Sequence, residues 1–455
     1  MTFAALVLVS GPASAQVPLP PKAAVTRVVD SLATAFLAAN AAPSVAIAVV
    51  RGTDTITLQV WGRAIMETGV AATAATVYRI GSVTKQFTAA AVMQLVEAGR
   101  VRLDDSIATY LSSLPLAWRP VTVRQLLNHT SGIPSYTDLG APWHARWAEE
   151  MTPATLVGLT ANTPMNFVPG TAWRYTNSGY VVLGMLIEKM TGHTWAFEIA
   201  SRFAGPLKLT DTRPCRNVPA GNDAHGYELT GATWVPAEFL AMTQPYAAGA
   251  LCSTIGDLVK WNHALHTGRV VSASSYALMT TPAGAAATGG MKYGFGLARD
   301  SMPGWAIISH GGGINGFITG NVWIPSAELS ITVLTNSGGA GADALVRQIG
   351  RASLGLALIQ PPRARPISAE ARARFVGVYA LALPGGARDL TFAEKGEELT
   401  AQLAGQGANT LLYLGDNSFG VTFDPNFRFV FTVDGARATK VMLVQGGGRF
   451  EGVRK

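Results

Sequence analysis

The segment Gly81-Ser82-Val83-Thr84-Lys85 places a hydroxyl and an amine three residues apart, at the start of an alanine-rich stretch with helical spacing of its apolar residues. Residues three apart lie on one face of a helix, so the amine can reach the serine oxygen. An ammonium there stabilises a serine alkoxide, and a desolvated lysine can instead lose its proton and act as a base. The pattern predicts a nucleophilic Ser82, although an N-cap serine followed by a surface lysine gives the same short motif.

A second polar group is Tyr175-Thr176-Asn177, which follows a turn at Pro169-Gly170 and precedes a helical stretch. A phenol near two cations can be driven toward phenolate from its ordinary pKa of ~10, and it can then exchange protons with a serine and a leaving group. Asn177 can hold Lys85 or a substrate amide oxygen. The alternative is a tyrosine packed in a turn beside a capping asparagine.

The third group is His310-Gly311-Gly312-Gly313, which continues an apolar strand-like run at residues 305–309. Glycines let a strand edge lie close to a substrate, and a backbone N–H there, for example that of Gly313, could join the N–H of Ser82 as an oxyanion hole. The same glycines satisfy the dinucleotide pattern G-x-G-x-x-G. The residues after them alternate as a strand rather than a helix, so we expect no nucleotide cofactor.

Together these motifs resemble those of the serine β-lactamase and penicillin-binding family. The similarity is to its class C-like branch, which includes D-alanyl-D-alanine carboxypeptidases, D-aminopeptidases and serine esterases, and it covers about residues 25–355. It implies that Ser82 is acylated and that Lys85 and Tyr175 transfer protons. The matching segments are residues 82–88, 103–105, 126–133, 175–177 and 248–251, with Asp257.

The resemblance also implies that His310 replaces the lysine of a Lys-Thr-Gly triplet. A lysine holds a substrate carboxylate with a permanent charge, whereas histidine, with an ordinary pKa near 6.5, is mostly neutral at pH 7 and binds anions less firmly. Peptidases and esterases of the branch also carry histidine here. The difference therefore argues against an efficient β-lactamase.

The first 360 residues mix helical and strand-like patterns, which predicts an α+β fold. The resemblance implies an antiparallel sheet flanked by helices, with a helical subdomain. Helical spacing is clearest at residues 24–39, 86–98, 180–190 and 254–266, and strand-like runs occur at 44–50, 305–309 and 329–334.

A proline-rich stretch at residues 360–366 predicts a domain boundary, because it can continue neither a helix nor a central strand. We therefore expect a hydrolase domain at residues 16–360, and a linker with a second domain at 361–455. In the second domain, turn signals about every ten residues predict a small antiparallel barrel of around eight strands, similar to the lipocalin-like appendage of some family members. Phe427, Phe429 and Phe431 are expected to fill its core rather than line a ligand cavity.

The N-terminus predicts export. Residues 3–9 are apolar, and Ala13-Ser14-Ala15 resembles a signal-peptidase site, so we expect a signal peptide at residues 1–15 and a periplasmic or secreted protein. No later apolar run reaches roughly 18 uninterrupted residues, so stable membrane insertion is not expected. Cys215 and Cys252 are the only cysteines. They can pair in an oxidising compartment or remain as reduced buried thiols.

Other function classes find little support. The 35 Lys+Arg exceed the 28 Asp+Glu, yet no long basic run or RNP motif accompanies this surplus, so nucleic acid is not an expected partner. His263 and His266 lack a third ligand, so we expect no metal. His129 lies in a matching loop that it is expected to order. A Gly-x-Ser-x-Gly elbow is absent, which argues against an α/β-hydrolase.

The sequence thus predicts a serine hydrolase that acts through an acyl-enzyme on a small-molecule or peptide substrate, without a cofactor. The expected substrates are small peptides, D-amino-acid peptides among them, or short acyl esters. A class C-like β-lactamase is one alternative, and a penicillin-recognition sensor without turnover is another. Oligomers formed through the C-terminal domain are left open.

Overall fold

The computed structural model describes residues 18–455, apart from Ala232, Ala340, Pro361 and residues 384–385, 405–407, 422–426 and 446–447. The expected signal peptide at residues 1–15 lies outside the described residues, as does Pro361 of the expected linker. Of the helices in the described residues, none combines the length and apolar character that a membrane span requires.

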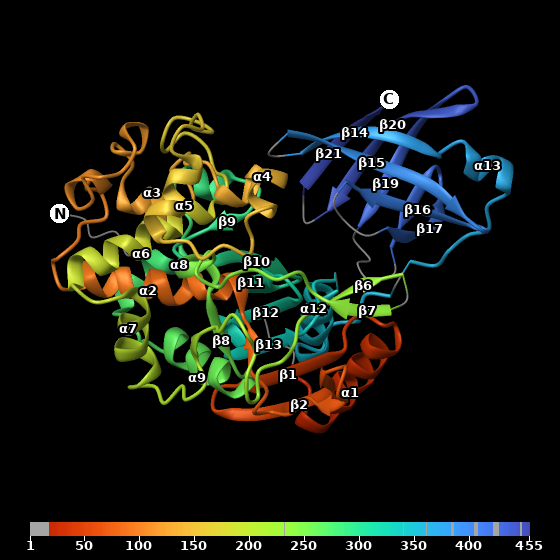
Figure 1. The fold of residues 1–455 in the computed structure, drawn as a ribbon. Coiled ribbons are helices and arrows are strands. Elements are labelled where there is room, and N and C mark those ends of the chain that lie inside the picture. The colour runs from red at the N-terminus through yellow and green to blue at the C-terminus, as the bar shows by residue number, and fades with distance from the viewer. Residues whose placement is uncertain are drawn as a thin grey trace, which may run out of the picture.

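An eight-stranded antiparallel sheet forms the centre of the larger part of the molecule (Figure 1). The first long strand, β1, pairs with β13, so chain segments almost 300 residues apart meet at its middle, where Ile47 faces Val333. The strands, in sheet order, are β3 (Val70–Ala71), β2 (Asp54–Ile65), β1 (Ser44–Arg51), β13 (Leu329–Thr335), β12 (Phe317–Ile324), β11 (Trp305–Ile314), β10 (Ala298–Met302) and β9 (Lys292–Tyr293).

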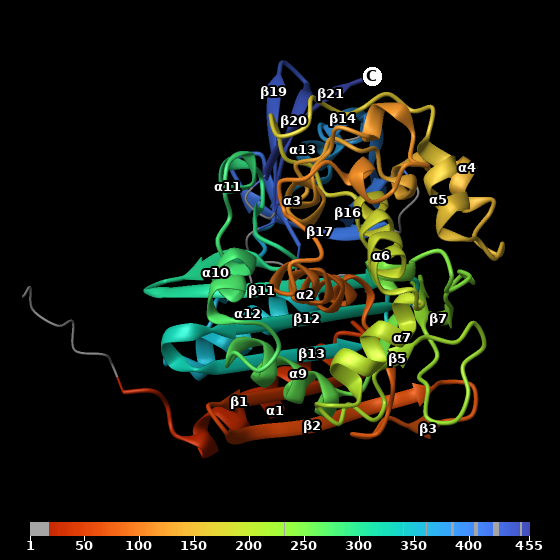
Figure 2. The same cartoon turned by 90° about the vertical axis from the view of Figure 1, so that its left-hand side faces the viewer.

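Helices cover both faces of this sheet. On one face, α1 (Lys22–Ala38) and α12 (Ala342–Ser353) pack against each other and bury a core that includes Val29, Ile331 and Ile349. On the other face lie α2 (Thr84–Glu97) and α9 (Ile255–His266), which Figure 2 shows in front of the sheet. Burial on both faces fits the almost continuous apolar run of β1, whereas β13 is also buried along its whole length but includes Ser330, Thr332 and Thr335.

The helical subdomain lies around α2 and carries the largest core. Its central helix, α6 (Asn177–Thr191), contacts α2 and four neighbouring helices. Small residues on α2, such as Ala90, allow these elements to approach closely, and the Phe87 ring stacks on Trp261 at 3.6 Å. The neighbouring helices are α3 (Val123–Leu127), α5 (Pro153–Thr160), α7 (Trp195–Ile199) and α8 (Tyr246–Gly249), and α4 (Ala141–His144) precedes α5.

Short strands next to the helices hold a disulfide. Cys215 follows β5 (Arg213–Pro214), and Cys252 lies in β8 (Leu251–Ser253); the two are bonded, with Cα atoms 5.0 Å apart. Of the two alternatives that the sequence left open, the structure contains the disulfide and not the reduced thiols. Further short elements are β4 (Tyr78–Arg79), β6 (Tyr227–Thr230), β7 (Thr233–Pro236), α10 (Ala273–Thr280), α11 (Ala285–Thr288) and α13 (Ala369–Ala373).

The C-terminal region forms a closed antiparallel barrel of eight strands, coloured blue in Figure 1. The fold class expected from the sequence is confirmed. Phe427, Phe429 and Phe431 belong to the barrel's own core, where Phe431 packs against Phe392 and Tyr379. The strands are β14 (Gly377–Leu383), β15 (Gly386–Lys395), β16 (Glu398–Leu403), β17 (Asn409–Gly415), β18 (Ser418–Gly420), β19 (Arg428–Asp434), β20 (Arg437–Gln445) and β21 (Gly448–Arg454).

The predicted domain boundary can be tested by a chain that ends at Gln360. The barrel has a core separate from the two cores of the larger part, so the shortened chain should fold. It should also still react with a fluorophosphonate at Ser82, because Ser82 and its expected partners precede the boundary. Circular dichroism is the folding control. A folded but unreactive chain would mean that the barrel helps to build the site.

Candidate active site

Ser82 lies in a single 3₁₀ turn, Gly81–Val83, that leads directly into α2. Its side chain is partly exposed, while both neighbours in the turn are buried. Gly81 has a φ of +49°, and a Cβ there would lie 2.9 Å from the backbone nitrogen of Gly313. The turn therefore requires glycine before the serine, and it presents the Ser82 hydroxyl at the start of a helix.

Lys85 is fully buried beneath Ser82. Its amine lies 3.0 Å from Ser82 Oγ, and it donates hydrogen bonds to Asn177 Oδ1 at 2.8 Å and to the Ala248 carbonyl at 2.8 Å. These partners are a hydroxyl, an amide oxygen and a carbonyl oxygen, so none supplies a negative charge. Burial therefore lowers the pKa of Lys85 well below its usual value of 10.5.

Asn177, the first residue of α6, is held in one orientation. Its backbone N–H donates to Ser135 Oγ at 3.0 Å, and its side-chain Nδ2 donates to Thr137 Oγ1 at 3.1 Å. The Oδ1 atom is thereby directed at Lys85. Of the two roles that the sequence allows for Asn177, the contact with Lys85 is the one present in the structure.

Tyr175 lies against both Ser82 and Lys85. Its hydroxyl is close enough to Ser82 for Ser82 to affect its pKa, and the Lys85 amine lies 4.7 Å from the centre of its ring. Burial raises the pKa of the phenol well above 10, and the contact with Ser82 opposes this only in part. Burial therefore favours the neutral phenol of Tyr175 over the phenolate that the sequence also allowed.

His310 is only 6% exposed, and both of its ring nitrogens have partners. Its Nδ1 lies 2.5 Å from the Gly311 carbonyl, which can only accept, so Nδ1 carries the hydrogen. The Tyr293 hydroxyl then donates to Nε2 at 2.7 Å. Burial, with a further contribution from Lys85, lowers the pKa of His310 to about 3. The imidazole is therefore neutral and bonded on both sides, and its role in binding a substrate remains a prediction.

The glycine-rich half of β11 lies directly against the Ser82 turn. Strand β10 pairs with β11 only as far as Ser309, so the following residues have no β10 partner on that edge. A Cβ on Gly312 would lie 2.0 Å from the Ile80 carbonyl oxygen and 3.2 Å from the Ser82 nitrogen. Gly311 pairs with Gly320 on β12. The backbones of Gly313 and Ser82 therefore both lie close to the serine turn, and the oxyanion hole that they could form remains a prediction.

Comparison with known proteins shows the family of this chain. The family described as Beta-lactamase has a model that matches residues 29–355. The chain belongs to the β-lactamase family. Among curated relatives, a D-aminopeptidase from Brucella canis is 28% identical over 342 residues, which make up 74% of this chain but only 63% of that protein.

Solved structures give the same result. A D-stereospecific amidohydrolase from Streptomyces sp. is 29% identical, covers 74% of this chain and all of its own, and has a TM-score of 0.63. An octameric penicillin-binding protein homologue from Pyrococcus abyssi is 24% identical and has a TM-score of 0.67. It covers 94% of this chain and 100% of its own, so the likeness in fold extends into the barrel.

Three contacts in this β-lactamase-family hydrolase could not be found from the sequence. His129 accepts a hydrogen bond from the Thr176 N–H at 3.2 Å, and its ring lies 4.3 Å from that of Tyr175, so it positions the tyrosine as well as ordering its own loop. Tyr293 binds His310 without any motif of its own. The third contact is between Lys85 and the Ala248 carbonyl. Ala248 lies in a segment that matches the family, but the residue type does not reveal what a backbone oxygen binds.

Gly312→Ala tests the contact between β11 and the Ser82 turn. The added methyl group would collide with the Ile80 carbonyl, so the strand and turn must separate, and we expect kcat/KM to fall by about 100-fold or more. Gly256→Ala is the matched control, because a Cβ there meets nothing within 4 Å. Steady-state kinetics and melting curves of both variants provide the measurement. An unchanged kcat/KM for Gly312→Ala would contradict the placement of β11.

Proposed function

We propose that this hydrolase forms an acyl-enzyme at Ser82 and cleaves amide or ester bonds in small peptides, D-amino-acid peptides among them, or in short acyl esters. The observation that carries the proposal is the 3.0 Å hydrogen bond between Lys85 and Ser82, made by an amine that is fully buried. A serine oxygen in contact with a desolvated amine is an activated nucleophile.

Counting hydrogens supports Lys85 as the base. The Asn177 and Ala248 oxygens can only accept, so two hydrogens of the amine are used there. A neutral amine has two hydrogens and one lone pair. With both hydrogens engaged, its lone pair is directed at the third partner, Ser82 Oγ. An ammonium would also fit these three contacts, but burial lowers the pKa of Lys85 and favours the neutral amine that accepts the serine proton.

The reaction can be written with its protons accounted for. As Ser82 Oγ attacks the substrate carbonyl carbon, its proton moves to Lys85, and the N–H groups of Ser82 and Gly313 stabilise the oxyanion. Tyr175 donates its proton to the leaving amine or alkoxide and regains one from Lys85. The carbonyl–heteroatom bond breaks, leaving an ester on Ser82. Water then attacks the ester carbonyl carbon and passes a proton through Tyr175 to Lys85; the bond to Ser82 Oγ breaks, Lys85 returns the proton to Ser82, and the acid product leaves.

The surroundings of His310 bear on the substrate. Because its imidazole is neutral and bonded to Tyr293, a substrate carboxylate finds no permanent charge there. This disfavours β-lactams and carboxylate-terminated peptides relative to neutral esters and amides. The similarity to a D-aminopeptidase and a D-stereospecific amidohydrolase supports D-amino-acid amides as the first compounds to test. β-Lactam hydrolysis is the second candidate, since the family carries it by name.

Export and assembly are parts of the same proposal. The apolar residues 3–9 and the Ala13-Ser14-Ala15 site support a periplasmic or secreted enzyme. The octameric homologue, which is similar over 94% of this chain, supports a search for oligomers that include the barrel. Size-exclusion chromatography with light scattering measures that state.

Ser82→Ala tests the nucleophile. We expect it to lose hydrolysis of D-phenylalaninamide and p-nitrophenyl butyrate by at least about 10³-fold and to lose fluorophosphonate labelling. The wild-type enzyme should turn over both compounds with a higher kcat/KM than a chromogenic cephalosporin. Undiminished hydrolysis by Ser82→Ala, or labelling of another serine, would remove Ser82 from the mechanism. A labelled wild-type enzyme that turns over none of the three would favour the sensor alternative.

The pH dependence distinguishes the base. Protonated Lys85 cannot accept the serine proton, so kcat/KM should fall as pH decreases through the pKa of Lys85, which lies well below 10.5. Tyr175→Phe should lower the rate about 100-fold or more but keep this acidic limb. Lys85→Met should lose the limb together with most of the activity. If Tyr175→Phe abolishes the limb while Lys85→Met retains it, the tyrosine is the base.

A further inference from the structure

A cavity of about 500 Å³ lies behind the candidate active site. It is bordered by the start of α5, the end of α6, α7, the disulfide region and α8, and it contains neither Ser82 nor Lys85, Tyr175 or Asn177 among its lining residues. On α6, eleven residues separate Asn177 from Glu188 in the cavity wall, a distance of about 16 Å along the helix. The cavity is therefore distinct from the site at Ser82.

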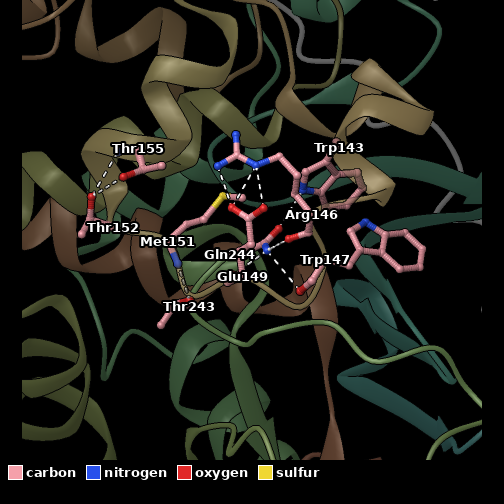
Figure 3. A network of polar contacts seen from close by, with 9 residues as sticks. All are labelled: Trp143, Arg146, Trp147, Glu149, Met151, Thr152, Thr155, Thr243 and Gln244. Carbon is pink, nitrogen blue, oxygen red and sulfur yellow. Dashed lines mark hydrogen bonds and ion pairs between the residues drawn. The ribbon is translucent and has the colours of Figure 1, made fainter.

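Gln244 fixes the chain next to the cavity near α4 and α5, through the polar contacts drawn in Figure 3. The Nε2 of this fully buried side chain lies within hydrogen-bond distance of the carbonyls of Arg146, Trp147 and Glu149, at 2.7, 3.1 and 2.8 Å, and its two hydrogens serve these three acceptors. The Trp143 indole donates to its Oε1 at 2.8 Å. Because the Gln244 amide is bonded to residues 146–149, it holds in place the cavity-lining residues that follow this segment and the one next to Gln244. Those drawn in Figure 3 are Met151, Thr152 and Thr243.

The chemistry of the lining is apolar with one carboxylate. Among the described residues that line the cavity, Glu188 alone has a formally charged side chain. Its Oε1 accepts the Trp195 backbone N–H at 2.9 Å. The Tyr246 hydroxyl is close enough for Glu188 to contribute to raising its pKa, after the larger effect of burial. This hydroxyl is nevertheless buried without a hydrogen bond of ordinary geometry.

Two aromatic rings stand beside that carboxylate. The rings of Trp195 and Tyr246 lie 5.4 Å apart at an angle of 56°. Trp195 is fixed, because it is 2% exposed and its indole N–H donates to Thr88 Oγ1 at 3.1 Å. A carboxylate next to aromatic rings attracts an organic cation, and a ligand ammonium in the cavity could bond the Glu188 carboxylate.

We propose that this cavity is a second binding site, which takes a small aromatic ammonium ion. The ring of the ligand occupies the apolar space between Met151, Pro214 and Met242, and its ammonium lies against Glu188, near the Tyr246 ring. The proposal does not depend on the proposed function, because binding here requires no chemistry at Ser82.

The cavity is connected to Lys85 through α8. Thr88 Oγ1, which receives the Trp195 indole N–H, donates to the Ala247 carbonyl at 2.7 Å. The next carbonyl, that of Ala248, binds Lys85. Tyr246 begins the same short helix with a φ of +39°, so a ligand that contacts its ring acts on the element that holds the amine. Occupancy of the cavity should consequently change kcat.

Benzylammonium is the probe, and benzyl alcohol is its neutral counterpart of similar shape. Isothermal titration calorimetry at pH 7 should give saturable binding of benzylammonium, tighter by about tenfold or more than that of benzyl alcohol. Glu188→Gln retains an acceptor for the Trp195 N–H but removes the charge, and it should erase this difference. Glu370→Gln, an exposed site on α13, is the matched control and should change nothing. Ala196→Phe, which adds bulk to the cavity wall, should weaken both compounds.

The proposed site would be wrong if the wild-type enzyme bound the two probes equally. It would also be wrong if Glu188→Gln still preferred benzylammonium. Binding to Ser82→Ala should match the wild type, and its loss would place the probe at the active site instead. In kinetic assays, benzylammonium should change kcat in the wild type and not in Glu188→Gln. Binding without any change in kcat would contradict the connection through α8.

Discussion

The buried amine of Lys85 is the constraint on which the site depends. Removing an ammonium from water without a negative partner is costly, so the fold favours the neutral form of this lysine. The same burial would be unfavourable for a neutral amine with unsatisfied hydrogens. The carbonyl of Ala248 and the amide oxygen of Asn177 satisfy them, and Ser82 completes the set.

These three partners of Lys85 come from three elements that are far apart in the sequence. Ser82 precedes α2, Asn177 begins α6 and Ala248 lies in α8, and the close packing of these helices brings their oxygens to one atom. Gly184 on α6 shows how tight this packing is, because a Cβ there would lie 2.4 Å from the Tyr246 ring. The sheet also borders the site, because Gly312 allows β11 to contact the turn that carries Ser82.

The sequence best predicted those features of the site and fold that depend on residue type and spacing. Ser82 and Lys85 are one helical turn apart, so their contact follows from helix geometry alone, and the alternating strands after residue 366 predicted the barrel. It was least successful where burial decides the outcome. The neutral Tyr175 and the bonding of His310 to Tyr293 depend on desolvation and on partners that no motif marks. Backbone groups such as the Ala248 carbonyl are equally invisible in a sequence.

The protonation state of Lys85 is the most direct measurement of the central claim. With ¹⁵N-labelled lysine, the amine signals can be followed by NMR across pH, and the Lys85→Met protein identifies which signal belongs to Lys85. The account predicts that this amine titrates well below the usual 10.5 and is the most displaced of the lysine side chains. A Lys85 signal that titrates at the ordinary value would contradict it, because an ammonium cannot accept the proton of Ser82.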